Sequence, residues 1–216
     1  AGEVTSLFAS GGRLMVGSSG CELTLLEAGV SGNGGDYAVS RRLTVDGPVN
    51  SLVMDPSGSE GIVGTGSSTV WYCNIERSEV VQLVSGHQGQ VLSISAASGT
   101  PFYATSCFDG SLHVWSISGR TASKLMRFDA EGHCLCSALT PSGDACVGGY
   151  SDGIVRRFQM DTAQTSRVAR EHDSPVCSCF FSLDGTRLLT AAVSGTVAIF
   201  DAENLASVGF PRDVAG

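Results

Sequence analysis

The chain has 216 residues, of which 42% are hydrophobic, so it is long enough to bury a substantial core. Its formal net charge is −8, and its basic residues form no run longer than two, which argues against a surface for nucleic acid or for anionic lipid. The sequence contains no run of about 18 apolar residues, so it predicts no membrane-spanning helix. Glycine is common (28 residues) and charged residues are few (16%), which favours short strands and many turns.

Five similar segments follow one another along the chain, at intervals of 42 to 45 residues. They begin at Val4, Val49, Val91, Cys134 and Val176. Each segment starts with an alternating apolar strand and continues through a glycine turn, a second strand, a tight turn, a third strand and a less regular fourth strand. In the third segment the later strands are expected at 102–106, 112–117 and 124–128, with a tight turn at Asp109-Gly110.

The other segments repeat this plan. Tight turns are expected at Asp152-Gly153 and Ser194-Gly195, because glycine readily adopts the positive φ that hairpin turns require. The remaining strands that the pattern places clearly are 80–84, 154–160, 188–192 and 196–201. A lone four-stranded meander has two apolar faces and cannot bury both, whereas stacked meanders can. The sequence therefore predicts an all-β domain of five repeats, at about 3–46, 47–88, 89–131, 132–173 and 174–216.

Gly86-His87 lies just before the third repeat, which carries Thr105, Asp109 and Trp115, and by this spacing the chain resembles WD-repeat β-propellers over nearly its whole length. The resemblance implies four-stranded antiparallel blades and a hydrogen-bonded brace. In this brace the Trp115 indole donates to the Thr105 hydroxyl, which meets His87, whose other nitrogen donates to Asp109. A Thr-His-Asp nucleophile is the alternative, but no oxyanion-hole element accompanies it. We therefore expect a structural tetrad, no enzyme and no cofactor.

The other repeats depart from this pattern. The fifth keeps His172 and Thr190 but has Ser194 and Phe200 in place of Asp and Trp. The fourth keeps Asp152, with Phe158 at the Trp position and Gly148 at the hydroxyl position, and the second has Cys73 at the Trp position with Trp71 two residues earlier. Closed WD-repeat rings usually have seven blades, so we expect the five repeats to be part of a larger ring.

The eight cysteines include two Cys-x-Cys pairs, Cys134 with Cys136 and Cys177 with Cys179. Alternate residues of a strand share a face, so each pair could in principle chelate a metal. Structural zinc sites, however, space paired cysteines two to four residues apart on loops. We therefore expect buried, reduced thiols in a cytoplasmic protein and no metal site.

The order of SEGIVGTGSSTVWYCNI, VQLVSGHQGQV and GGYSDGIVRRF resembles a narrower family of centriolar and ciliary WD-repeat proteins. The resemblance implies a non-enzymatic protein-interaction scaffold of the centriole, basal body and cilium, in the cytoplasm and cytoskeleton. A soluble adaptor, such as a ubiquitin-ligase substrate receptor or a signalling platform, is the alternative. In propellers, partners bind the loops at one face, so we expect partner contacts at Gln88, Gln90, Phe108, Ser151 and Val193. Phe108 could instead pack against its neighbouring blade.

Overall fold

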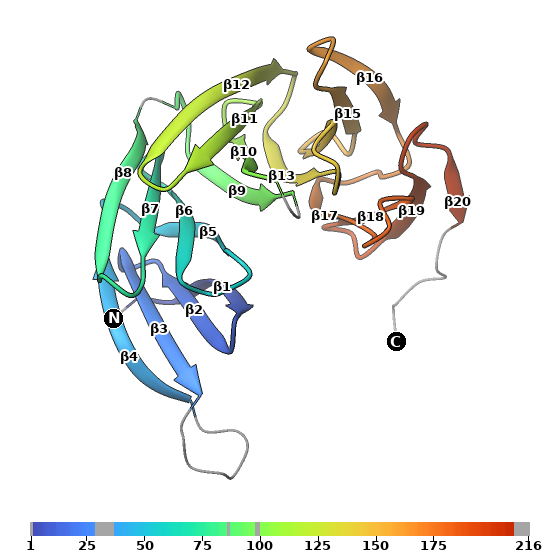
Figure 1. Ribbon diagram of the computed structural model, residues 1–216. Coiled ribbons are helices and arrows are strands. Elements are labelled where there is room, and N and C mark those ends of the chain that lie inside the picture. Colours follow the sequence, from blue (N-terminus) through green and yellow to red (C-terminus); the bar gives the residue numbers. More distant parts are fainter. Residues whose placement is uncertain (1, 29–36, 86, 98–99, 210–216) are drawn as a thin grey trace. The chain divides into compact units, whose positions relative to one another are not determined.

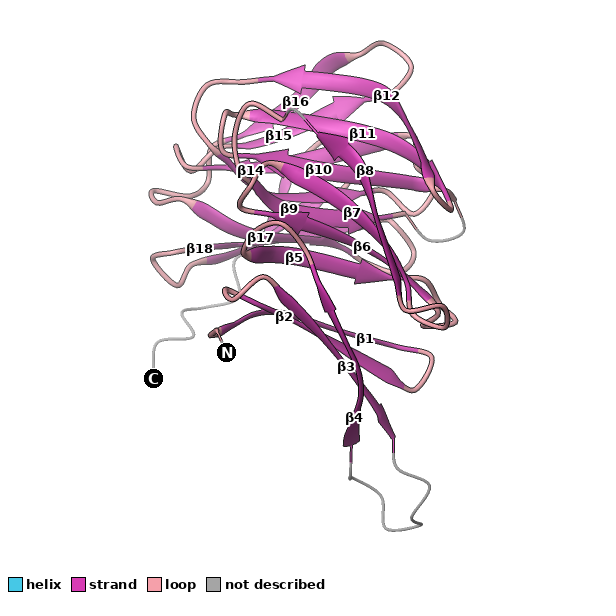
Figure 2. Cartoon of the chain, turned by 90° about the vertical axis from the view of Figure 1, so that its left-hand side faces the viewer, coloured by secondary structure: helices cyan, strands magenta, loops and turns pink. Residues whose placement is uncertain are grey.

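A computed structural model describes residues 2–28, 37–85, 87–97 and 100–209, so Gly86 lies outside the described residues. Throughout this part of the chain the regular elements are strands, and there is no helix (Figure 1). Figure 2 shows the same strands from a second direction. The strands form five four-stranded antiparallel sheets, each a meander in chain order. The predicted all-β fold of four-stranded antiparallel blades is confirmed.

The sheets are called blades one to five. Blade one contains β1 (Val4–Ser10), β2 (Arg13–Ser18), β3 (Glu22–Ala28) and β4 (Tyr37–Thr44). Blade two contains β5 (Val49–Met54), β6 (Glu60–Thr65), β7 (Thr69–Asn74) and β8 (Glu79–Ser85). Blade three contains β9 (Val91–Ala96), β10 (Phe102–Cys107), β11 (Ser111–Ser118) and β12 (Thr121–Asp129). Blade four contains β13 (Cys134–Leu139), β14 (Ala145–Tyr150), β15 (Val155–Gln159) and β16 (Gln164–Ala169). Blade five contains β17 (Val176–Phe181), β18 (Arg187–Ala192), β19 (Val197–Asp201) and β20 (Ser207–Gly209).

The chain forms two compact units, residues 1–91 with 119–121 and residues 92–118 with 122–216. In the first unit, blades one and two share a core that includes Met15, Leu23 and Val63. In the second, one core that includes Leu112 and Phe158 joins blades three and four, and another that includes Val147 and Phe200 joins blades four and five. Burial of these apolar faces is what stabilises the stacked meanders.

Most first strands begin with a register shift, and this shift decides which way the cysteines face. In blade four it lies between Cys134 and Cys136, and a bulge of this kind interrupts the alternation of side chains. Cys134 packs in the core between blades three and four, whereas Cys136 packs in the core between blades four and five. In blade five Cys177 is exposed and Cys179 is buried. The expectation that each pair shares one face was therefore wrong, and so was the expectation that all the thiols are buried.

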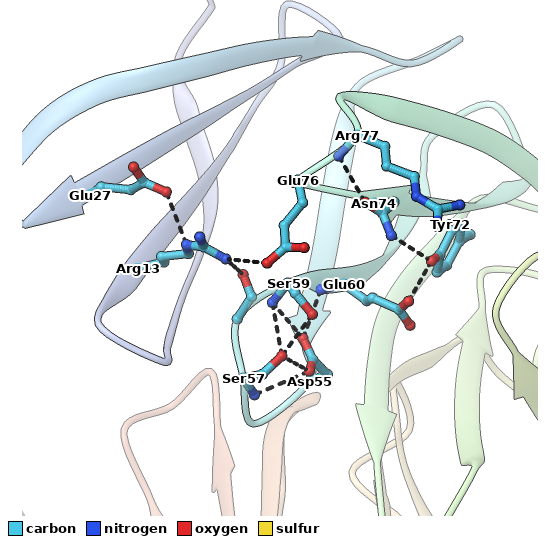
Figure 3. Close-up of polar contacts among 11 residues, drawn as sticks. Arg13, Glu27, Asp55, Ser57, Ser59, Glu60, Tyr72, Asn74, Glu76 and Arg77 are labelled. Atoms are coloured by element: carbon cyan, nitrogen blue, oxygen red, sulfur yellow. Dashed lines mark hydrogen bonds and ion pairs between the residues drawn. The ribbon is translucent and has the colours of Figure 1, made fainter.

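Polar contacts within the first unit connect blade one to a turn of blade two (Figure 3). Arg13 of β2 pairs with Glu27 at 2.9 Å and donates to the Gly58 carbonyl oxygen at 3.2 Å, in the turn between β5 and β6. Asp55 closes that turn by accepting backbone hydrogen bonds from Ser59 and Glu60 at 2.8 and 2.7 Å. Burial raises the pKa of Asp55, but hydrogen bonds from the Ser57 hydroxyl and from the backbone of Glu60, Ser57 and Ser59 outweigh it and hold the pKa below its usual value.

Candidate functional site: the polar braces and the turn surface

The predicted brace of blade three begins at Trp115, which is 6% exposed on β11. Its indole Nε1 donates to the hydroxyl of the fully buried Thr105 on β10, at 2.9 Å. Asp109 accepts hydrogen bonds from the backbone and hydroxyl of Ser111, at 3.0 and 2.6 Å, and so closes the turn between β10 and β11. His87 is buried, and its bonds to Thr105 and to Asp109 stay predictions. The Trp115–Thr105 bond ties two neighbouring strands together inside the blade.

Blade five forms a histidine bridge without the Asp and Trp of the family pattern. His172 Nε2 lies 2.7 Å from the Thr190 hydroxyl, and Nδ1 lies 3.0 Å from the Thr196 hydroxyl. Thr196 thus takes the place on the imidazole that the pattern gives to Asp. Burial lowers the pKa of His172, although Asp173 and Glu171 act in the opposite sense, so the neutral ring is favoured. This role of Thr196 was missed by sequence reasoning, which compared only the pattern positions.

Blade two has a brace of different composition, centred on Asp46 just before β5. Its carboxylate accepts hydrogen bonds from Thr65 at 3.2 Å and from Thr69 at 2.7 Å. Trp71 Nε1 donates to both Asp46 and Thr69, at 3.0 Å each. Asp46 therefore occupies the place of a brace histidine, and Trp71 donates from two positions earlier on the strand. The signal in the sequence was an Asp three residues before a first strand, combined with a displaced Trp.

In blade four an aromatic ring fills the place of the brace. A Cβ at Gly148, the hydroxyl position, would come within 2.8 Å of the Tyr150 ring and within 3.0 Å of the Cys134 sulfur. Tyr150 is fully buried, and the guanidinium of Arg156 lies 4.3 Å from its ring centroid while pairing with Asp152 at 2.7 Å. The tyrosine ring thus occupies the space that a larger side chain at 148 would need, and Arg156 makes a cation–π contact with it.

Phe108, in the turn between β10 and β11, is an exposed aromatic residue of the second unit. Phe108 is 47% exposed, and one face of its ring stacks on His133 with centroids 3.7 Å apart and an interplanar angle of 15°. His133 Nδ1 also pairs with the carbonyl oxygen of Phe108. Phe108 contacts the loop before the next blade and still presents an aromatic surface to solvent, and its contact with a partner stays a prediction.

Backbone hydrogen bonds join this loop to the corresponding turn of blade four. The His133 N–H donates to the Ser151 hydroxyl at 2.9 Å, and the Ser151 N–H donates to the His133 carbonyl oxygen at 2.9 Å. Ser151 is half-buried, so its hydroxyl is engaged within the surface. His133 was not among the residues expected at a partner surface, and its only signal was its position directly before a first strand.

Blade five continues the pattern with an apolar residue. Val193, between β18 and β19, is 67% exposed, and its N–H donates to the Pro175 carbonyl oxygen at 2.9 Å. Ser174 donates to the Ser194 hydroxyl at 2.8 Å beside it. These turns and the loops that they contact are called the turn surface, which comprises 108–110, 131–133, 151–153, 172–175 and 193–195. Gln88 and Gln90, in the first unit, are both exposed.

Burial controls the protonation of several cysteine thiols. Burial raises the pKa of Cys73 and of Cys107 to about 12, so both thiols are protonated at neutral pH. All eight cysteines are free of disulfides. Across 2–28, 37–85, 87–97 and 100–209, no three His, Cys, Asp or Glu side chains are grouped so as to hold a metal ion. The same residues contain no helix long and apolar enough to cross a membrane.

Residues 78–116 and 164–201 match the family described as WD domain, G-beta repeat. These ranges include the Trp115–Thr105 pair of blade three and the Thr190–Thr196 hairpin of blade five. The chain contains WD repeats.

Three relatives extend the comparison. WD repeat-containing protein 90 of Xenopus tropicalis is 32% identical to this WD-repeat chain over 216 residues, which cover 92% of this chain and 12% of that protein. WD repeat-containing protein 90 of Homo sapiens is 30% identical over 217 residues, with the same coverage of both. Centriole proteome protein 16 of Chlamydomonas reinhardtii is 24% identical over 259 residues, which cover 89% of this chain and 12% of that protein. The WD-repeat chain therefore spans about an eighth of the length of these relatives.

Proposed function

We propose that this WD-repeat chain is a non-enzymatic scaffold that binds other proteins through its turn surface during centriole, basal-body and cilium assembly. The observation that carries the proposal is Phe108, an aromatic ring that is 47% exposed yet fixed in place by His133. A rigid aromatic side chain loses little conformational entropy on binding, and aromatic residues are enriched among the residues that dominate interface energies. Val193 supplies a second exposed apolar contact on the same surface.

The cellular role rests on the relatives. One of them is named as a protein of the centriole proteome, and another similar protein, 24% identical over 143 residues, is named Cilia- and flagella-associated protein 251. The protonated thiols and the hydrogen bonds that occupy the brace hydroxyls support a binding role over a catalytic one. The acidic balance of the chain, −8, suits a scaffold better than direct attachment to the acidic surface of a microtubule.

Imaging of the tagged full-length protein tests the cellular role. We expect discrete puncta at centrioles or basal bodies, and diffuse staining of the cytosol or nucleus would instead support a soluble adaptor. In the same cells Phe108→Ala should weaken recruitment, because loss of a central aromatic contact commonly lowers affinity by about ten-fold or more.

Leu125→Ala is the matched control, since Leu125 is a similarly exposed apolar residue (40%) on the fourth strand of the same blade, outside the turn surface. Recruitment of the Leu125 variant should be unchanged. Equal recruitment of the Phe108 variant and the wild-type protein would show that Phe108 does not form the contact.

A further inference from the structure

A cavity of about 610 Å³ lies between blades four and five, away from the turn surface. It is lined by the turns between β13 and β14 and between β17 and β18, at the opposite ends of the strands from Ser151 and Val193, and by residues of β15 and β16. The charged residues of the lining are Arg157, Arg167, Asp144, Asp184 and Glu203. A cavity of this size accommodates a few amino-acid residues or a small ligand.

Arg157 on β15 lies at a position that is apolar in the neighbouring blades. It pairs in register with Val147, and the equivalent pairs are Val114 with Ala104 in blade three and Ile199 with Leu189 in blade five. Arg157 is only 8% exposed. Transfer of a guanidinium from water into such a site is unfavourable unless its charge and its N–H groups find partners.

The hydrogen bonds of Arg157 leave one end of the guanidinium available. Nε donates to the Ala202 carbonyl oxygen at 3.1 Å, and Nη1 donates to Gln159 Oε1 at 2.6 Å and to the Ser166 hydroxyl at 3.1 Å. A guanidinium carries five N–H donors, so these bonds account for three, and the two on Nη2 have no acceptor within the described part of the chain. All three acceptors are neutral, and none of the ion pairs formed by the described residues includes Arg157.

The carboxylates of the cavity do not neutralise Arg157 directly. Asp144 is engaged by the hydroxyls of Thr140 and Ser142, at 2.6 and 2.7 Å. These bonds, with a smaller contribution from the charge of Arg157, hold the pKa of Asp144 below its usual value, so it stays ionised. Asp184 and Glu203 are exposed, and hydrogen bonds from Ser182 and Thr186 lower the pKa of Asp184 to about 2.

We propose that this cavity binds a peptide segment of a partner protein through one carboxylate side chain. The oxygens of this carboxylate accept hydrogen bonds from the two N–H groups on Nη2 of Arg157. A carboxylate matches the planar donors of a guanidinium and supplies the charged acceptor that the hydrogen bonds of Arg157 lack. The lining carries three carboxylates and two arginines, so its charge favours a carboxylate that is flanked by basic groups over a free inorganic anion. We expect basic residues of the peptide, on either side of the bound carboxylate, to lie beside the exposed carboxylates of Asp184 and Glu203. This second site is independent of the proposed role of Phe108.

The test uses the 216-residue chain and two labelled, end-blocked pentapeptides, one with a glutamate between two lysines and one with glutamine in its place. Fluorescence anisotropy should give a Kd at least ten-fold lower for the glutamate peptide than for the glutamine peptide. Arg157→Met, which keeps the volume and removes the charge, should abolish this difference. Arg127→Met is the matched control, because Arg127 is an arginine of blade three outside the cavity.

A second variant guards against a folding defect in Arg157→Met. Ser142 is exposed at the cavity, so Ser142→Trp should fold and should weaken binding of the glutamate peptide by obstruction. Glu203→Gln should weaken binding of the lysine-flanked peptide but not of a glycine-flanked glutamate peptide. Equal affinities for glutamate and glutamine peptides, or undiminished preference in Arg157→Met, would overturn the proposal. Preference for free glutamate or for a phosphoserine peptide over the glutamate peptide would overturn it as well.

Discussion

At the scale of single residues, the two tryptophans each donate an indole N–H to a threonine hydroxyl, but from different positions on the third strand. Trp115 is buried and donates to Thr105, whereas Trp71 is half-buried and donates to both Thr69 and Asp46. In each blade an indole N–H and a threonine hydroxyl satisfy one another inside the sheet. Buried polar groups are costly when unpaired, so these bonds hold strands in one register rather than adding much net stability.

Trp115→Phe should lower the free energy of unfolding by about 1–3 kcal/mol, because it removes the donor to a fully buried hydroxyl. Trp71→Phe is the matched comparison, and it should cost less, since Asp46 and Thr69 also bond to each other and lie nearer to solvent. Urea unfolding monitored by circular dichroism gives both values. A loss within 0.5 kcal/mol for Trp115→Phe would mean that the bond to Thr105 contributes little.

At the scale of the elements, the tight turns between second and third strands fix how neighbouring blades meet. Gly110, Gly153 and Gly195 occupy equivalent turn positions with φ of 88°, 77° and 87°, as the Asp-Gly and Ser-Gly pairs predict. Their surroundings differ. A Cβ at Gly153 would lie 2.5 Å from the His172 carbonyl oxygen of the next blade, whereas a Cβ at Gly195 would meet nothing within 4 Å. Glycine is therefore required at 153 by its positive φ and by the close carbonyl oxygen, and at 195 by its positive φ alone.

This difference predicts the outcome of a pair of substitutions. Gly195→Ala should cost about 1–2 kcal/mol, which is the strain of a side chain at positive φ. Gly153→Ala should cost more, about 2–5 kcal/mol, because the carbonyl of the next blade must also move. Equilibrium unfolding of the two variants separates these contributions. Equal losses would show that the contact between the turn and the next blade adjusts without cost.

At the scale of the whole molecule, one apolar sheet face of blade five is exposed, whereas the equivalent face of blade four is buried. Ala138 and Val147 of blade four are buried against blade five. The equivalent residues of blade five, Phe180 and Leu189, are 66% and 40% exposed. The expected larger ring stays a prediction, and it accounts for this face, because a further blade packed on it would remove both side chains from water.

The double substitution Phe180→Ser with Leu189→Ser tests this arrangement. In the 216-residue chain it should reduce binding of a hydrophobic dye at least two-fold and leave the free energy of unfolding within about 0.5 kcal/mol. In the full-length protein the same change should lower the thermal midpoint, since the residues would then be buried. An unchanged midpoint there would contradict the presence of a blade on this face.

The sequence by itself determined the fold, because the repeat can be recognised from residues that are close together in the chain. The period and the glycine turns depend on residues close together in the chain and were read correctly, whereas bulges interrupt the expected alternation in most first strands. The Trp115–Thr105 pair followed from the family resemblance rather than from these signals, and the bonds of His87 stay a prediction.

Only the tertiary structure decided which polar groups meet across distance. The bulge between Cys134 and Cys136 sends the two thiols to opposite cores, and a one-residue shift in register is enough to do this. Asp46 replaces a histidine, and Arg157 lies beside a cavity made by two blades. The physical reason is that a buried polar atom is satisfied by whichever partner packing brings to it, and packing joins residues about forty positions apart.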